Sequence, residues 1–406
     1  MRQACQKLGI IAFLAVVTAT LSAPVSALAG GIDVTENRVE HSFAQHVTFS
    51  LKASSESDIT EVYLFFHAGH DEETEKTQVP LETPSREISV QHTHDVRRYP
   101  LPPFADITYW WQIEDADGHQ LKTQPKLLKY TDNRFNWEQL SDAGITIHVI
   151  DDAAGPAFSQ TALDLARASV EDINAELRAP TPDPFDIFIY DSERDLEAAM
   201  VLAGRDWAGG QARPELGAVV IAVPAVEGYS STMKRYLPHE ITHLLVYQLV
   251  TSEGYRYVPA WLDEGLATAN EPWPTPEYEL VLEEARGTGR LLAVEELCYP
   301  FSPDPRTAML SYAQSASLVR FIRQQYGADG IRRLLSAYAN GASCTSGVQE
   351  ALGVQFDRLE NDWRNSLEPE ARSEVWADRA GVWIGLWLLS LVIAVPMIGE
   401  IRRRRA

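Results

Sequence analysis

The sequence predicts an α+β domain that is preceded by an all-β sandwich and followed by a single transmembrane helix. Three observations predict this arrangement. Apolar and polar residues alternate from about Asp33 to Leu128, as they do in half-buried strands. From Ile145 onward, strand-like and helix-like segments alternate and then give way to helices. Residues 381–399 contain no charged residue, and four arginines, Arg402 to Arg405, follow shortly after them.

The first 29 residues have the features of a secretory signal peptide. Arg2 and Lys7 flank the start of an apolar run from Leu8 to Leu21, and Ala27-Leu28-Ala29 offers small residues for cleavage. The alternative is an uncleaved N-terminal anchor, for which the apolar run is short. We therefore expect a signal peptide at residues 1–29 and export of the remaining chain.

Residues 30–135 are predicted to form the β-sandwich. Val47, Phe49 and Leu51 alternate with polar residues, and short strands of this kind with turns between them resemble an immunoglobulin or fibronectin type III domain. Such modules are usually spacers or binding platforms, so a protein partner is one expectation for this domain. Its paired histidines suggest a second metal site, but no cysteine or tight carboxylate set accompanies them. These histidines are His67, His70, His92 and His94.

Residues 140–370 are predicted to form the α+β domain. The expected strands are Ile145–Val149, Phe185–Tyr190 and Gly217–Val223, and the expected helices are Ala157–Leu177 and Arg194–Ala203, with helices throughout after about Ser231. A mixed sheet followed by a helical half is an α+β arrangement.

Residues 380–399 are predicted to be a transmembrane helix, and residues 400–406 a cytoplasmic tail. The span is close to the ~20 residues that cross the hydrocarbon core, and an arginine cluster stays on the cytoplasmic side. A buried core helix is the alternative, but such helices rarely end in four consecutive arginines at a chain terminus. We therefore expect a single-pass protein of the cell membrane, with its ectodomain outside and its C-terminus in the cytoplasm.

Charge and cysteine usage fit an exported domain. The chain has a formal net charge of −22, and its two basic ends make the part between them more negative still. A surface this acidic repels phosphate backbones, so a nucleic-acid partner is not expected. Cys5 lies in the signal peptide, and Cys298 and Cys344 are expected to form one disulfide bond in an oxidising compartment.

The stretch His239-Glu240-Ile241-Thr242-His243 carries the chemistry. On a helix, residues four apart lie on one face, so both imidazoles can bind one Zn²⁺, and Glu240 then lies beside the metal rather than on it. These two histidines are the only ones after His148, which favours a metal site. Because proline removes a hydrogen bond, the helix either begins near Leu237 or is kinked at Pro238.

A second motif, Trp261-Leu262-Asp263-Glu264-Gly265-Leu266-Ala267, places Glu264 21 residues after His243. With these two motifs the chain resembles the gluzincin superfamily of zinc metallopeptidases, and within it the peptidase-MA-like branch. The resemblance implies a zincin-like metallopeptidase domain, a protein or peptide substrate, and one Zn²⁺ per chain held by His239, His243 and Glu264.

Neighbouring acids leave alternatives open. Glu253 or Glu271 could ligate instead of Glu264. Asp263 either orients an imidazole N–H or is exposed.

The predicted mechanism is hydrolysis of a peptide bond. Three protein ligands leave one zinc position for water, whose proton Glu240 accepts as general base and passes to the leaving amine. The resemblance further implies a downstream tyrosine that stabilises the oxyanion, and Tyr312 is the candidate. Three other tyrosines compete with it: Tyr236, Tyr255 and Tyr257. The strand Gly217–Val223 is either the edge strand that pairs with substrate or a buried strand.

Three hypotheses follow from these motifs. The first is an active extracytoplasmic zinc peptidase. The second is a surface binding protein that uses a catalytically inactive zincin-like scaffold, and the presence of Glu240 argues against it. The third is a structural zinc domain, which would need a fourth protein ligand that is not evident nearby. The sequence shows no clear acidic motif that would bind the amino terminus of a substrate. Aminopeptidase activity is therefore not favoured over endopeptidase activity.

Overall fold

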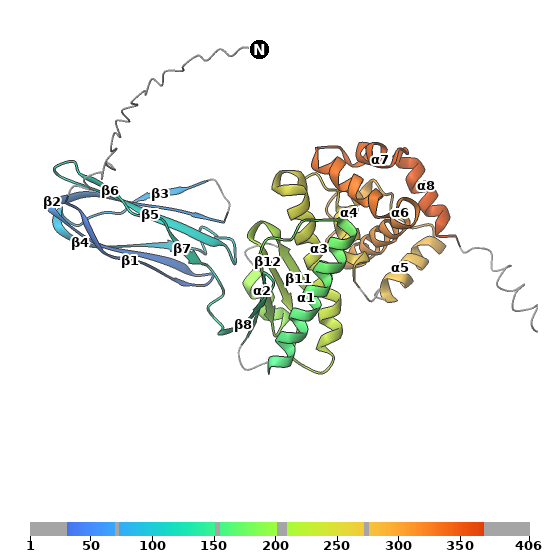
Figure 1. The fold of residues 1–406 in the computed structure, drawn as a ribbon, viewed down its shortest axis with the longest axis horizontal. Helices are drawn as coiled ribbons and strands as arrows, with labels where there is room; N and C mark the ends of the chain where they lie inside the picture. Colours follow the sequence, from blue (N-terminus) through green and yellow to red (C-terminus); the bar gives the residue numbers. More distant parts are fainter. Residues whose placement is uncertain (1–30, 70–72, 151–154, 201–208, 272–275, 369–406) are drawn as a thin grey trace, which may run out of the picture.

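The computed structural model describes residues 31–69, 73–150, 155–200, 209–271 and 276–368. The predicted signal peptide at residues 1–29, transmembrane helix at residues 380–399 and tail at residues 400–406 all lie outside these ranges. Among the helices of the described ranges, none has both the length and the apolar character needed to span a membrane. A β-domain at the N-terminal end is joined to a mixed sheet and then to a group of helices (Figure 1).

The N-terminal β-domain consists of antiparallel strands, of which β1, β3, β4 and β5 pair with the long strand β2, and β6 and β7 pair with β5 (Figure 1). The first half of β2 pairs with β1 and β4, and its second half pairs with β3 and β5. The rings of Phe49 and Phe66, one from each half, stack at 5.2 Å, so the two halves face each other across a common core. The strands are β1 (Asp33–Ser42), β2 (His46–Ala68), β3 (Glu75–Gln78), β4 (Ser85–Asp95), β5 (Asp106–Asp115), β6 (Gln120–Lys122) and β7 (Lys126–Lys129).

The second sheet has the strand order β11-β12-β10-β9-β8. The three inner strands run parallel, and the two edge strands are antiparallel to their neighbours. The bounds are β8 (Trp137–Asp142), β9 (Ile145–Ile150), β10 (Phe185–Tyr190), β11 (Gly210–Arg213) and β12 (Ala218–Ala222). An inner strand is covered on both faces, which explains why β12 is apolar at every position.

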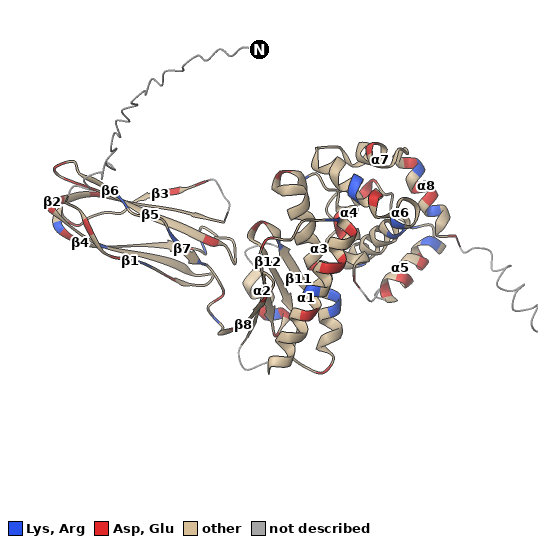
Figure 2. Cartoon of the chain, viewed as in Figure 1, with Lys and Arg blue, Asp and Glu red and all other residues tan. Residues whose placement is uncertain are grey.

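The helices lie between the strands of this sheet in the sequence or follow its last strand. They are α1 (Gly155–Leu177), α2 (Glu193–Met200), the 3₁₀ turn η2 (Pro214–Leu216), α3 (Tyr229–Tyr255), α4 (Ala260–Ala269), α5 (Pro276–Gly287), the 3₁₀ turn η3 (Glu296–Cys298), α6 (Pro305–Ala339), α7 (Cys344–Leu352) and α8 (Phe356–Ser366). Acidic and basic residues occur together on α5 and on α8 (Figure 2). The predicted disulfide bond between Cys298 and Cys344 is confirmed, and it joins η3 to the start of α7.

Strand β10 divides its side chains between two hydrophobic cores. Ile187 and Ile189 point into the core that the sheet shares with α1, α3 and the C-terminal helices. Phe188 and Tyr190 point the opposite way, into a core that includes the N-terminal β-domain. The ring of Phe188 lies 4.4 Å from that of Phe104, which belongs to the β-domain. The β-domain and the mixed sheet are therefore packed against each other through apolar contacts.

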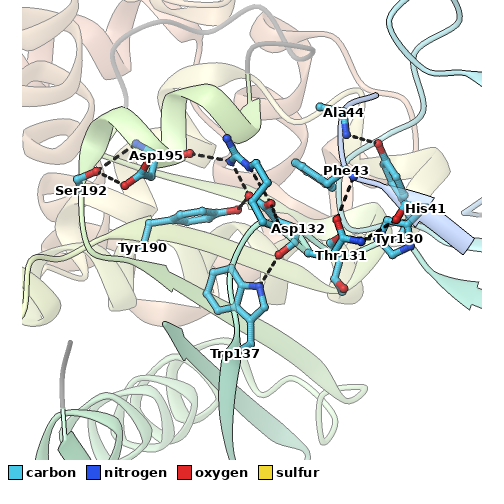
Figure 3. A network of polar contacts seen from close by, with 12 residues as sticks. His41, Phe43, Ala44, Tyr130, Thr131, Asp132, Trp137, Tyr190, Ser192 and Asp195 are labelled. Atoms are coloured by element: carbon cyan, nitrogen blue, oxygen red, sulfur yellow. Dashed lines mark hydrogen bonds and ion pairs between the residues drawn. The ribbon is translucent and has the colours of Figure 1, made fainter. Parts of the chain in front are cut away.

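A polar network reinforces this junction (Figure 3). Asp132, which is fully buried, accepts hydrogen bonds from the Arg134 guanidinium and from the Tyr190 hydroxyl at 2.8 Å. Its backbone oxygen accepts a further bond from the Trp137 indole at 2.7 Å. A buried carboxylate needs such partners to compensate for its lost hydration. Hydrogen bonds to the buried Asp132 thus anchor the connection between the two parts.

Of the two sequence-based alternatives for the metal-site helix, the structure agrees with the one in which the helix runs through Pro238. Helix α3 starts at Tyr229, so the expected start near Leu237 is wrong and Pro238 lies inside the helix. The Thr242 hydroxyl donates to the Pro238 oxygen at 2.7 Å within this turn. The backbone leaves helical angles further along, at Thr251 with φ 67°.

Candidate metal centre

Helices α3 and α4 bring three predicted ligands together. His239 and His243 lie one turn apart on α3, with ring centroids 5.1 Å apart. Helix α4 follows Pro259 and packs back against α3. It places Glu264 Oε2 3.6 Å from His239 Nε2 and 3.4 Å from His243 Nε2. The ligand atoms of the three residues all lie within 4.8 Å of one another.

The other nitrogen of each imidazole faces a carboxylate. His239 Nδ1 is hydrogen-bonded to Glu271 Oε1 at 3.0 Å, and His243 Nδ1 lies 3.1 Å from Asp263 Oδ1. Such partners hold the Nδ1 proton and leave Nε2 as the metal-binding atom. The Tyr255 hydroxyl donates in turn to Asp263 Oδ2 at 2.7 Å.

The positions of the side chains favour Glu264 over the alternatives for the third ligand. Glu271 lies at the Nδ1 side of His239, away from the Nε2 atoms that converge on Glu264. Glu253 is exposed near the end of α3 and is not part of the cluster. Asp263 is the partner of His243 and is not an exposed acid, with 17% of its side chain accessible.

The residues present fit a zinc ion. Two imidazole nitrogens and one carboxylate oxygen are the donor set of a three-ligand zinc site. Burial alone lowers the pKa of His239, but the carboxylates of Glu264 and Glu271 outweigh burial and raise that pKa to about 9. Burial raises the pKa of Glu264, whereas His243 and His239 outweigh it and hold that pKa below its usual value. The site therefore attracts positive charge, whether as protons or as a metal cation.

Glu240 lies beside this cluster, tied to an edge strand. The Ala212 backbone N–H, on β11, donates to Glu240 Oε2 at 2.7 Å. The Glu240 side chain approaches β11 so closely that a Cβ at Gly210 would lie 2.8 Å from Glu240 Oε1, and only glycine leaves this space. Burial raises the pKa of Glu240, opposed by the two nearby histidines.

The edge strand beside Glu240 is β11, which the sequence analysis did not predict. The strand Gly217–Val223 corresponds to β12, which pairs with β10 on one side and β11 on the other, so it is the buried strand of the two alternatives. Strand β11 has only four residues and an unpatterned sequence. Its signal is the pair Gly209-Gly210, which permits the close approach to Tyr236 and Glu240.

A cavity of about 580 Å³ opens over the cluster. His239, Glu240, His243 and Glu264 line it together with β11 and Tyr312. We refer to it as the metal-site cavity.

The predicted tyrosine lies at this cavity. The ring of Tyr312, on α6, is 6.2 Å from that of His239 and 5.1 Å from that of Phe301. Among its competitors, Tyr255 donates its hydroxyl to Asp263, and Tyr257 is outside the residues that line the metal-site cavity. Tyr236 does line the cavity, next to Gly209.

The histidines of the β-domain do not form a second centre in the described ranges. Among the residues placed by the structure, the one group of three metal-binding side chains is His239, His243 and Glu264. His94 is buried, and its Nε2 is hydrogen-bonded to the Tyr99 backbone oxygen at 2.8 Å. His70 lies outside the described residues.

Comparison with known families agrees with this geometry. The Peptidase MA superfamily matches residues 166–369, half of the chain, and the protein belongs to this superfamily. The resemblance predicted from the two motifs is thereby confirmed. A comparison with curated proteins finds no match.

Several solved structures match part of the chain at low similarity. OgpA from Akkermansia muciniphila is 9% identical over 25% of this chain and 28% of its own, with a TM-score of 0.21. A family 56 carbohydrate-binding module, described as a β-1,3-glucan-binding domain, is 14% identical over 24% of this chain and 99% of its own, with a TM-score of 0.17. A family 64 β-1,3-glucanase from Paenibacillus barengoltzii is 16% identical over 31% of this chain and 28% of its own, with a TM-score of 0.18. We draw no conclusion about activity from likenesses at these TM-scores.

Proposed function

We propose that the protein is a zinc peptidase that hydrolyses peptide bonds outside the cytoplasm. One observation carries the proposal: the buried Glu240 carboxylate lines the same cavity as the converging ligand atoms of His239, His243 and Glu264. Membership of the Peptidase MA superfamily supports the same class of activity.

In this proposal, each residue has a distinct task. Zinc bound by the three ligands supplies Lewis acidity, which lowers the pKa of water and polarises the scissile carbonyl. Glu240 accepts a proton from the attacking water and returns it to the leaving amine. Its raised pKa, caused by burial, suits a group that must both take up and release a proton. The Ala212 N–H fixes the orientation of this carboxylate.

Two further elements fit an extended peptide substrate. Strand β11 is an edge strand that lines the metal-site cavity, and an edge offers backbone groups with which a peptide can pair. The Tyr312 hydroxyl is proposed to donate to the oxyanion of the tetrahedral intermediate.

Chelation and ligand removal test this proposal. The full chain, purified in detergent, is expected to contain one equivalent of zinc and to cleave a quenched peptide library. Chelator should abolish cleavage and added zinc should restore it, whereas His243→Ala should bind little zinc. Stoichiometric zinc without cleavage of any peptide would favour the alternative, a surface binding protein with a catalytically inactive zincin-like scaffold.

The cellular location is part of the proposal. The charge-free segment and the arginine cluster support a single C-terminal membrane anchor with a cytoplasmic tail. We also propose that the β-domain is an immunoglobulin-like or fibronectin type III-like module. A protein partner is proposed for this domain. Alkaline carbonate extraction should leave the full chain in the membrane fraction and release a variant that lacks residues 380–406.

A further inference from the structure

A second cavity adjoins the metal-site cavity. It has a volume of about 770 Å³ and shares Asp263, Glu264 and Tyr312 with the metal-site cavity. These three residues therefore form a common wall, and the two cavities are neighbours on either side of it.

Aromatic and prolyl side chains contribute much of the lining of the second cavity. The described part of the chain has six exposed large apolar side chains, and two of them, Tyr257 and Tyr299, line this cavity with 44% and 67% of their surface accessible. Phe301, Pro300 and Pro303 also belong to the apolar lining. We call this space the aromatic pocket. Exposed aromatic side chains gathered in a concave site mark a place where an apolar ligand group is bound.

The charges of the aromatic pocket narrow the class of ligand. Beyond the shared wall, Arg256 is the only charged side chain among the described residues that line it. Its guanidinium lies 4.9 Å from the centre of the Tyr257 ring, so that the cation covers an aromatic face at the rim. The acids of the shared wall, Asp263 and Glu264, repel a carboxylate. The interior therefore suits an uncharged apolar side chain and not an acidic one.

The walls of the pocket are held in place by covalent and local constraints. The disulfide bond joins Cys298 to Cys344, and both cysteines line the pocket. Tyr299 follows Cys298 directly and leaves the 3₁₀ turn in an extended conformation. The Phe301 ring packs edge-on against the Tyr312 ring, with ring centroids 5.1 Å apart. The lining of the pocket therefore contacts the proposed oxyanion donor. A pre-formed pocket loses little entropy when a ligand enters.

We propose that the aromatic pocket is a specificity subsite that takes an apolar, preferably aromatic, side chain of the peptide substrate. The inference rests on the proposed function, because continuity with the metal-site cavity identifies the occupant as part of the substrate. Tyr257 and Tyr299 contact this side chain, and the shared wall places it next to the scissile bond.

Binding to an inactive variant tests the subsite separately from catalysis. Zinc-loaded Glu240→Gln, as the full chain in detergent, is titrated calorimetrically with alanine hexapeptides that carry a single Phe, Leu or Asp at each position in turn. At one position Phe should bind about tenfold more tightly than Ala, and Asp should bind more weakly than Ala. Tyr257→Ser and Tyr299→Ser, made in the same background, should each remove most of this preference.

Tyr99→Ser is the matched control, because Tyr99 is an exposed tyrosine of the β-domain and lines neither cavity. It should leave the preference for Phe unchanged. Equal affinities for all peptides, or a preference that survives both substitutions, would overturn the subsite even if the wild type cleaves peptides. A preference that both substitutions remove would support the subsite even if no peptide is cleaved.

Discussion

Replacing Asp263 by Asn should weaken zinc binding without disturbing the fold. The Asp263 carboxylate lies 3.1 Å from His243 Nδ1 and accepts a hydrogen bond from Tyr255 at 2.7 Å. Asparagine keeps the shape and one acceptor oxygen for Tyr255, but it removes the negative charge that makes the imidazole a better ligand. Loss of a partner of this kind typically lowers metal affinity about 10- to 100-fold, which corresponds to about 1.4–2.8 kcal/mol.

The assay is a competition titration of metal-free protein against a chromogenic zinc chelator. Glu253→Gln serves as the control, because Glu253 is an exposed acid on α3, the helix of His239 and His243, and lies outside the metal cluster. Thermal unfolding of the metal-free proteins checks that both variants are folded. An Asp263→Asn affinity within about twofold of the wild type, or an equal loss in Glu253→Gln, would refute the role assigned to this contact.

Three further predictions follow from the site and the junction. Tyr312→Phe should lower kcat by about 100-fold in steady-state assays and leave the zinc content unchanged. A kcat equal to that of the wild type would show that Tyr312 does not stabilise the oxyanion. Because the pKa of His239 is raised to about 9, the metal-free site holds protons at pH 7 that zinc must displace. Zinc affinity should therefore fall as the pH is lowered. Calorimetry in buffers of different ionisation enthalpy should show that zinc binding releases protons. Equal heats of zinc binding in all buffers would contradict this proton release. Asp132→Ala should lower the free energy of unfolding by about 3 kcal/mol, because it leaves the buried Tyr190 hydroxyl without its acceptor. Urea unfolding measures this change, and a loss below about 1 kcal/mol would show that the network contributes little to stability.

The two histidines of the candidate ligand set could be predicted from sequence because their determinants are local. The spacing of His239 and His243 puts both side chains on one helical face whatever the tertiary context. Glu264 could be assigned through the resemblance carried by its flanking residues, since its approach to the two histidines depends on how α4 packs on α3. The inner strands were also predictable, because their continuous apolar character reflects burial on both faces.

Other features depend on tertiary contacts that leave little trace in the sequence. Strand β11 is short and unpatterned, and it is a strand only because β12 pairs with it. Helix α3 extends upstream of Pro238, and a local rule for proline could not choose between this helix and one that starts near Leu237. The partnership of Glu271 with His239 joins residues from different elements and could be seen only in the folded chain.

The most direct test of zinc-dependent peptide hydrolysis compares wild type with Glu240→Gln. Both proteins are measured for zinc by elemental analysis and for turnover of a quenched peptide library under the same conditions. The account predicts one equivalent of zinc in each protein and cleavage by the wild type alone, because Glu240 takes the proton but does not hold the metal. Equal cleavage by the two proteins, or no zinc in either, would contradict it.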